Sequence, residues 1–259
     1  MTYEHIKYVK KFFCYLEKNA YLCRRNKCIM HKAFLFVIMA VMLCGGLSAQ
    51  ESFWAVTPTG DTLMCCIIEG TEEVSVSQYG GAQYESLAIP ERVSHEGREY
   101  RVTELGLAAF AECATLRWVS IPTSVTWIGR GAFAGCTRLA EVSTVDDVLI
   151  TKDGPQPEPM LTGIGPAAFA GCNMLRDIYI PARVTSIGYH AFMGCTGLKR
   201  VFFWGKVFMQ ELDQQAFDRQ HYESARFYFS DNDKRAVKAF KRRTGARHAE
   251  AGITAIIEI

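Results

Sequence analysis

The sequence lacks the short motifs with which many enzymes bind metal ions or nucleotide phosphates. It contains no CxxC pair, no HExxH, no calcium-loop spacing, no GxxxxGK loop followed by serine or threonine, and no GxGxxG turn between a strand and a helix. Adjacent carboxylates occur at Glu72 and Glu73 and at Asp146 and Asp147, but neighbouring side chains on a strand point to opposite faces. We therefore expect no metal site, no cofactor and no phosphate site.

The sequence also lacks an apolar run long enough to span a bilayer, which needs about 20 residues. The run at residues 33–43 is shorter, follows a basic dipeptide and leads to small residues ending at Ala49. This layout predicts a secretory signal peptide at residues 30–49. Residues 1–29 are then either an upstream extension, with translation starting at Met30, or an unusually long basic n-region. We expect an exported protein, extracellular, on the cell surface or periplasmic, whose mature form has no transmembrane span.

The region after residue 49 has no excess of positive charge. Residues 1–49 hold eight Lys and Arg and two acids, a net charge of +6, whereas the whole chain carries +2, which leaves −4 for the rest. A mildly acidic protein is a poor ligand for nucleic acid. We therefore expect no nucleic-acid partner.

Repetition is what the sequence has in abundance. The pattern Ala-Phe-x-x-Cys begins at Ala109, Ala132, Ala168 and Ala191, and a degraded copy begins at Ala216. Its phenylalanines are separated by 23, 36, 23 and 25 residues. A recurring period in the low twenties indicates a solenoid, in which each coil contacts only its neighbours. The phenylalanines should then stack in one column, and the cysteines should be equivalent core positions with free, buried thiols.

Each repeat can be interpreted position by position. A Leu-x-x-Val-x-Ile segment predicts a strand with its apolar residues facing inward, and the proline that follows it, as at Pro122 and Pro181, ends that strand. A Val-Thr step and an Ile-Gly or Leu-Gly step come next. We expect the glycines of this last step to permit a turn with positive φ. They are Gly106, Gly129, Gly165 and Gly188.

The segment Leu175–Leu198 (LRDIYIPARVTSIGYHAFMGCTGL) carries the whole pattern. It closely resembles the BspA-like leucine-rich repeat family of bacterial surface and secreted proteins, and the resemblance covers about residues 52–259. It implies a right-handed, β-rich α/β leucine-rich-repeat solenoid of about five repeats. It also implies partners among host proteins, matrix and other bacterial surfaces.

The expected organisation has three parts after the signal peptide: an N-terminal β cap at 50–86, leucine-rich repeats at 87–224 and a C-terminal cap at 225–259. Alternating strands broken by a turn at 58–61 predict a hairpin in the first cap. In the second cap we expect a helix at 233–243, with Ala236, Val237 and Phe240 as its apolar face, and a closing strand at 254–259.

Two insertions interrupt the repeats at the same phase, just after the main strand. Nine residues are added between Ile89 and Val102, and 13 between Thr144 and Leu161. We expect both to emerge on one side of the solenoid. Residues 147–154 of the second resemble an extra hairpin of the family.

The outward positions of the main strands form the candidate binding face. They include aromatic and charged residues that the core pattern does not require, and such residues are typical of recognition surfaces. The alternative is that strands simply favour aromatic residues. The candidates are Trp118, Ser120, Glu141, Ser143, Asp177, Tyr179, Arg200, Phe202 and Trp204.

We therefore expect an exported module for adhesion or recognition of a protein or glycan. The alternative is a structural spacer or self-assembling surface protein without a foreign ligand.

A cysteine-dependent enzyme is the rival class, because His190 lies five residues before Cys195. Yet His190 aligns with variable turn positions and Cys195 with core positions, whereas a catalytic thiolate needs exposure. We expect no catalytic residue. The basic residues between Lys234 and Arg247 are interpreted as the solvated face of the capping helix.

Overall fold

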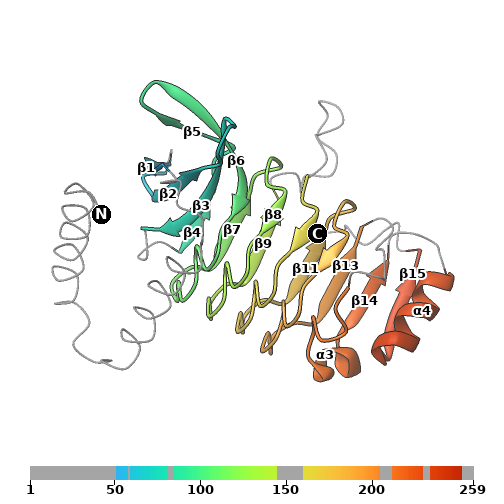
Figure 1. Ribbon diagram of the computed structural model, residues 1–259. Helices are drawn as coiled ribbons and strands as arrows, with labels where there is room; N and C mark the ends of the chain where they lie inside the picture. Colours follow the sequence, from blue (N-terminus) through green and yellow to red (C-terminus); the bar gives the residue numbers. More distant parts are fainter. Residues whose placement is uncertain are drawn as a thin grey trace, which may run out of the picture. The chain divides into compact units, whose positions relative to one another are not determined.

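The computed structural model describes residues 51–57, 59–80, 85–144, 160–204, 212–229 and 234–252, all of which belong to one compact unit, Gln50–Ile259. This unit is rich in short strands that line up in sheets of largely parallel strands (Figure 1). Equivalent strands of successive coils lie side by side, which is the arrangement that the repeat predicts.

The first sheet begins with antiparallel strands and continues with parallel ones. β1 and β2 form the hairpin that the sequence predicts, β3 extends it, and parallel strands of the successive coils follow. In sheet order the strands are β1 (Ser52–Val56), β2 (Thr62–Ile67), β3 (Glu73–Tyr79), β6 (Arg98–Leu105), β8 (Trp127–Ile128), β10 (Gly163–Ile164) and β12 (Ser186–Ile187).

The main strands of the repeats form two further sheets, both fully parallel. One contains β4 (Ser86–Ala88), β7 (Trp118–Ile121) and β9 (Glu141–Thr144). The other contains β11 (Asp177–Ile180), β13 (Arg200–Phe203), β14 (Arg226–Phe229) and β15 (His248–Ala251). β7 and β11 end directly before Pro122 and Pro181, as predicted. The outward positions therefore come into rows, one residue from each strand.

The repeated phenylalanines stack in a single column. Successive ring centroids from Phe110 through Phe133, Phe169 and Phe192 to Phe217 are 4.9, 5.2, 5.4 and 4.7 Å apart. Neighbouring planes differ by at most 9°, and every ring is almost fully buried. The stacked column predicted from the spacing is thus confirmed.

The repeated cysteines are buried core residues, as predicted. The thiols of Cys136, Cys172 and Cys195 each donate to the carbonyl oxygen of the phenylalanine one coil earlier, at 3.0, 3.2 and 3.1 Å. All four cysteines of the pattern are free thiols. They therefore join successive coils by hydrogen bonds as well as by packing.

The role expected for the Ile-Gly and Leu-Gly glycines is wrong. None of the four is among the residues with positive φ. A Cβ at Gly129 would lie 2.6 Å from the carbonyl oxygen of Leu105, and one at Gly188 would lie 2.6 Å from the backbone nitrogen of Pro166. Glycine is needed at this step because the backbone of the preceding coil passes too close for any side chain.

Positive φ occurs instead at two other positions of the turn. The residue before Ala-Phe adopts it in four coils: Ala108, Gly131, Ala167 and His190, with φ between 53° and 61°. The residue before cysteine adopts it at Glu112, Gly135, Gly171 and Gly194. His190 therefore occupies a left-handed turn position, in agreement with its interpretation as a variable turn residue.

The two insertions have different outcomes. The first forms a hairpin between β5 (Arg92–His95) and the start of β6, and this hairpin projects from the body (Figure 1). The second, at 145–159, lies outside the described residues, and so does the strand expected at 254–259.

The C-terminal region contains the predicted helix and two strands that were not predicted. Helix α4 (Lys234–Thr244) buries Val237 and Phe240. β14 and β15 continue the parallel sheet beyond β13, and β15 follows α4. The stacking of strands therefore extends through residue 251.

At the degraded copy that begins at Ala216, a side chain replaces the backbone carbonyl that accepts a hydrogen bond in the earlier coils. Gly171 donates its backbone N–H to Met193, in the next coil, whereas Gly194 donates to the Asp218 carboxylate at 2.7 Å. Asp218 also precedes helix α3 (Arg219–Ser224), and its backbone N–H donates to Nδ1 of buried His221. Nε2 of His221 then carries the proton and donates to the carbonyl oxygen of Cys195 at 2.8 Å.

Candidate functional site

The structure brings the predicted face residues into rows across two sheets. Trp118 lies opposite Glu141, and Ser120 opposite Ser143, on neighbouring strands β7 and β9. On β11 and β13, Asp177 lies opposite Arg200 and Tyr179 opposite Phe202. Trp204 follows β13, and its backbone N–H donates to Ile180. We call these nine residues the strand face.

The residues of the strand face are not equally accessible. Glu141, Tyr179 and Arg200 are exposed, and Trp118, Asp177 and Trp204 are partly buried. Ser120, Ser143 and Phe202, however, are only 7%, 9% and 7% exposed. The alternation of a strand predicts which side chains face outward, but it does not show what else packs on that side.

The burial of Phe202 has a clear cause, because aromatic rings stack along the row. The ring of Phe202 lies 4.7 Å from that of Tyr179 and 4.9 Å from that of Tyr228 on β14, and the Arg200 guanidinium lies 5.6 Å above it. Tyr228 was missed in the sequence because β14 has no Ala-Phe-x-x-Cys pattern before it. The alternation of Arg-Phe-Tyr-Phe in residues 226–229 was the available signal.

An ion pair fixes the charged row beside these rings. Arg200 donates through Nε and a terminal nitrogen to both carboxylate oxygens of Asp177, with the Nε bond at 2.8 Å. The Asp177 carboxylate raises the pKa of Arg200 through these bonds. A two-point pair of this kind restricts both side chains to one orientation.

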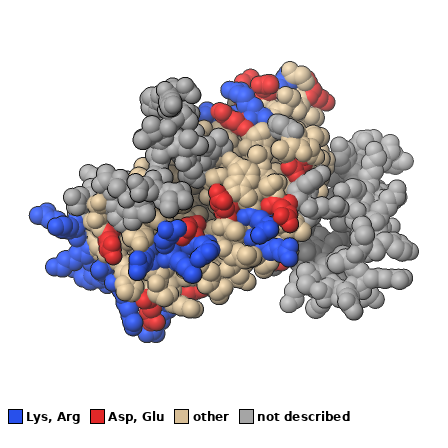
Figure 2. Space-filling view, turned by 180° about the vertical axis from the view of Figure 1, so that it is seen from behind, with Lys and Arg blue, Asp and Glu red and all other residues tan. Residues whose placement is uncertain are grey.

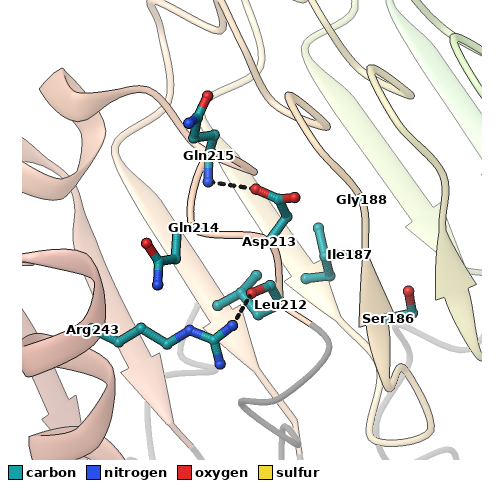
Figure 3. A pocket seen from close by; sticks show the side chains of 8 residues that line it. All are labelled: Ser186, Ile187, Gly188, Leu212, Asp213, Gln214, Gln215 and Arg243. Carbon is teal, nitrogen blue, oxygen red and sulfur yellow. Dashed lines mark hydrogen bonds between the residues drawn. The ribbon is translucent and has the colours of Figure 1, made fainter.

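A pocket of about 450 Å³ lies between the end of β12 and helix α4 (Figure 3). Arg243 donates to the carbonyl oxygen of Leu212 at 3.1 Å, and the backbone N–H of Gln215 donates to Asp213 at 2.8 Å. These two bonds use the guanidinium of Arg243 and the carboxylate of Asp213 to support the surrounding backbone. The described lining residues include no nucleophile paired with a base. The full described lining is Ser186, Ile187, Gly188, Leu212, Asp213, Gln214, Gln215 and Arg243.

One group among the described residues brings together potential metal ligands: Glu51, His95 and Glu96, whose ligand atoms lie within 4.8 Å of one another. The His95 ring stacks on Phe53 with centroids 4.0 Å apart, and its Nε2 lies 3.9 Å from Glu51. Both carboxylates are exposed to water. No motif in the sequence indicated this group, because β1 and the β5 hairpin meet only in the folded protein.

The environments of Cys136 and Cys172 oppose nucleophilic chemistry at these two thiols, whereas hydrogen bonding with Cys136 lowers the pKa of the buried Cys113. Hydrogen bonding to Cys113 and burial raise the pKa of Cys136, and hydrogen bonding to Cys195 and burial raise the pKa of Cys172. Burial raises the pKa of Cys65 to about 12. His190 stacks on Tyr189 instead of approaching a thiol, with ring centroids 3.5 Å apart.

Because the pKa values of these thiols are raised in the folded protein, the free energy of unfolding should depend on pH in the alkaline range. Unfolding releases Cys136 and Cys172 to the ordinary thiol pKa of about 8.5. Above that pH the unfolded chain binds fewer protons than the native one, so the free energy of unfolding should fall as pH rises, by up to about 1.4 kcal/mol per pH unit for each thiol. Urea unfolding between pH 7 and 10.5 measures the slope.

The double variant Cys136→Ala/Cys172→Ala is the control for this slope. It should be less stable at neutral pH but clearly less sensitive to pH above 8.5. Equal slopes for the two proteins would contradict the assignment of the pH dependence to these thiols.

Among the helices in the described part of the chain, none combines the length and the apolar character needed to cross a membrane.

Solved structures with similar chains are bacterial leucine-rich repeat proteins. A leucine-rich repeat protein from Bacteroides capillosus is 30% identical over 57% of this chain and 97% of its own, with a TM-score of 0.46. A leucine-rich cell surface protein from Faecalibacterium prausnitzii is 21% identical over 69% of this chain and 55% of its own, with a TM-score of 0.46. A leucine-rich repeat protein from T. pallidum is 23% identical over 79% and 97%, with a TM-score of 0.40.

The family comparison agrees with the resemblance found in the sequence. No curated protein matches the chain. The model of the BspA-type leucine-rich repeat region matches six copies, at residues 98–154 and 156–245, which is more than half of the chain. With the stacked phenylalanines and the parallel strands, this match shows that the chain belongs to the BspA-type leucine-rich repeat family.

Proposed function

We propose that this protein is an exported recognition module that binds a protein or glycan non-covalently through the strand face, at the cell surface or after secretion. Its repeat family suggests a protein-interaction module. Adhesion, location and partner class are our inference, and so is the absence of an enzymatic activity. So too is the detailed form of the scaffold, a right-handed solenoid of about five repeats with a cap at each end.

The observation that carries this proposal is the composition of the strand face. Trp118, Tyr179 and Trp204 keep part of their surface accessible, and each lies on or directly after a main strand held by backbone hydrogen bonds. Partly exposed aromatic side chains on a rigid support lose little conformational entropy on binding, and aromatic and Arg side chains dominate the energy of many interfaces.

The triple variant Trp118→Ala/Tyr179→Ala/Trp204→Ala tests the face. If these side chains are the main anchors, it should lower affinity by at least about 100-fold, since loss of a central anchor often costs 2 kcal/mol or more. Binding would be measured against a panel of extracellular-matrix proteins and an array of glycans.

A matched control removes two tryptophans and one tyrosine elsewhere: Trp54→Ala/Trp127→Ala/Tyr189→Ala, whose side chains are exposed but lie outside the strand face. The control should bind like the wild type, and circular dichroism should show both variants folded. Equal loss in both triples, or no loss in either, would contradict the assignment of the face. Self-association in light scattering with no ligand bound would support a spacer instead.

A further inference from the structure

Positive charge is concentrated in the last quarter of the sequence. Residues 199–259 hold twelve Lys and Arg against eight acids, a net charge of +4, whereas residues 50–198 hold nine against seventeen, a net charge of −8. Figure 2 shows Lys and Arg side chains gathered at the end of the molecule that carries α4 and spread from there across the face drawn. The positive charge of the chain after residue 49 is therefore concentrated toward its C-terminal end.

Three of these cations, together with Arg176 from the preceding segment, lie along the starting edge of the second main-strand sheet. Arg176, Lys199 and Arg247 directly precede β11, β13 and β15, and Arg226 is the first residue of β14. Backbone bonds link three of them: Lys199 donates to Arg176 and Arg226 donates to Lys199, at 2.7 and 2.8 Å, whereas Arg247 donates to Tyr222. Arg226 lies opposite Arg200, one position further along its strand than Lys199. Since neighbouring strands lie about 4.8 Å apart, this edge offers a cation at the start of each successive strand. We call these four residues the basic strip.

The basic strip is accessible and is not neutralised within the described structure. All four side chains are exposed, and none forms an ion pair with any residue that the structure describes. Asp177, the acid that directly follows Arg176, forms its ion pair with Arg200.

The exposed cations of α4 continue the same charge. Lys241 and Arg242, in its last turn, precede Arg247 in the chain and are exposed. On the helix, Lys238 lies three residues before Lys241 and four before Arg242, and like charges at these spacings destabilise a helix. Binding of an anion would relieve this repulsion.

We propose that the basic strip binds an acidic polysaccharide, a linear chain that carries sulfate or carboxylate groups. Cations placed at the starts of successive strands along one sheet edge fit an extended polymer better than a flat membrane. Trp54, Val56 and Leu107, three exposed apolar side chains that could anchor a bilayer, lie elsewhere, on β1 and after β6. This inference rests on the proposed function and deepens it. The basic strip borders the strand face, and its charge specifies one class of partner, an acidic polysaccharide.

A second copy of this chain fits less well than a polysaccharide. Several acids in residues 50–198 that could receive the strip are already paired: Glu51 with His95, Glu85 with Arg117 and Glu91 with Arg101. Self-association through these three acids would require their pairs to open.

The test compares two quadruple variants of the full chain that change net charge equally. One neutralises the strip: Arg176→Gln/Lys199→Gln/Arg226→Gln/Arg247→Gln. The other neutralises four exposed arginines elsewhere: Arg92→Gln/Arg98→Gln/Arg130→Gln/Arg138→Gln. The wild type and both variants share the basic residues at 1–49, so the contribution of these residues to binding cancels in the comparison.

Binding to immobilised heparin is measured at 50 and 200 mM salt, with neutral dextran as the blank. At 50 mM salt we expect the strip variant to bind heparin at least about tenfold more weakly than the wild type. Its affinity should also fall less steeply as salt rises, since fewer counterions are released on binding. The control variant should stay within about twofold of the wild type, a margin set by the small effect of isolated surface charges.

Several outcomes would overturn the inference. They are equal binding by the strip variant and the wild type, equal loss in the control, tighter binding to phosphatidylglycerol vesicles or duplex DNA than to heparin, and strip-dependent self-association. The strip variant retains Trp118, Tyr179 and Trp204, so its result is separable from the test of the strand face.

Discussion

Replacing Phe169 by alanine is expected to lower the free energy of unfolding by about 3–5 kcal/mol. Phe169 lies in the middle of the column, with Phe133 at 5.2 Å on one side and Phe192 at 5.4 Å on the other. The coils cannot close over the missing ring, because backbone hydrogen bonds to both neighbours hold them apart. Urea unfolding followed by circular dichroism measures the loss.

Tyr189→Ala serves as the control for the phenylalanine column. It also removes an aromatic ring, but Tyr189 is exposed at the turn, so its loss should cost less than about 0.5 kcal/mol. Because each coil contacts only its neighbours, Phe169→Ala should also make the transition less cooperative. A cost below about 1 kcal/mol for Phe169→Ala would mean that the column does not support the stack.

Replacing Gly129 by alanine is expected to cost about 3 kcal/mol or more, as overpacking against immobile atoms does. The added Cβ would lie 2.6 Å from the oxygen of Leu105 and 2.8 Å from the backbone carbon of Gly106. Both atoms belong to the backbone of the preceding coil, which cannot move aside without breaking its own hydrogen bonds. The loss would be measured by thermal and urea unfolding.

Gly131→Ala, two residues away, is the matched control. Gly131 has a φ of 61°, but a Cβ there would meet nothing closer than 3.7 Å. Alanine already occupies the equivalent left-handed position at Ala108 and Ala167. The change should therefore cost only about 1 kcal/mol, the strain of a left-handed residue. If Gly131→Ala proved the more harmful of the two, positive φ and not coil contact would govern the repeat glycines.

The repeat pattern predicted the features that depend on one residue type recurring at one phase. The phenylalanine column, the buried thiols, the strand ends at Pro122 and Pro181 and the apolar face of α4 all follow from local sequence and period. A core position is recognisable because every coil fills it with the same kind of side chain.

The features that were missed depend on contacts between coils. The Ile-Gly step requires glycine because the backbone of another coil passes close to it. The residues next to this glycine in the sequence do not indicate that contact. The burial of Phe202 depends on Tyr179 and Tyr228, which come from strands on both sides. β14 and β15 were missed because they continue the sheet without the Ala-Phe-x-x-Cys pattern that identified the other coils.

The candidate site was predicted in the same uneven way. Alternation placed all nine residues on or directly after the correct strands, but only the structure separates the accessible anchors from the buried serines and Phe202. The basic strip was not found in the sequence, where its members are 23, 27 and 21 residues apart and share no motif. The stacking of parallel strands brings them to one edge of the sheet.

A crystal structure of the chain would test the stacking of coils most directly, by locating the rings of Phe110, Phe133, Phe169, Phe192 and Phe217. We expect one continuous column, with successive centroids about 5 Å apart and nearly parallel planes. Rings dispersed among separate contacts, with Arg176, Lys199, Arg226 and Arg247 no longer at one sheet edge, would contradict both the stacked architecture and the surfaces inferred from it.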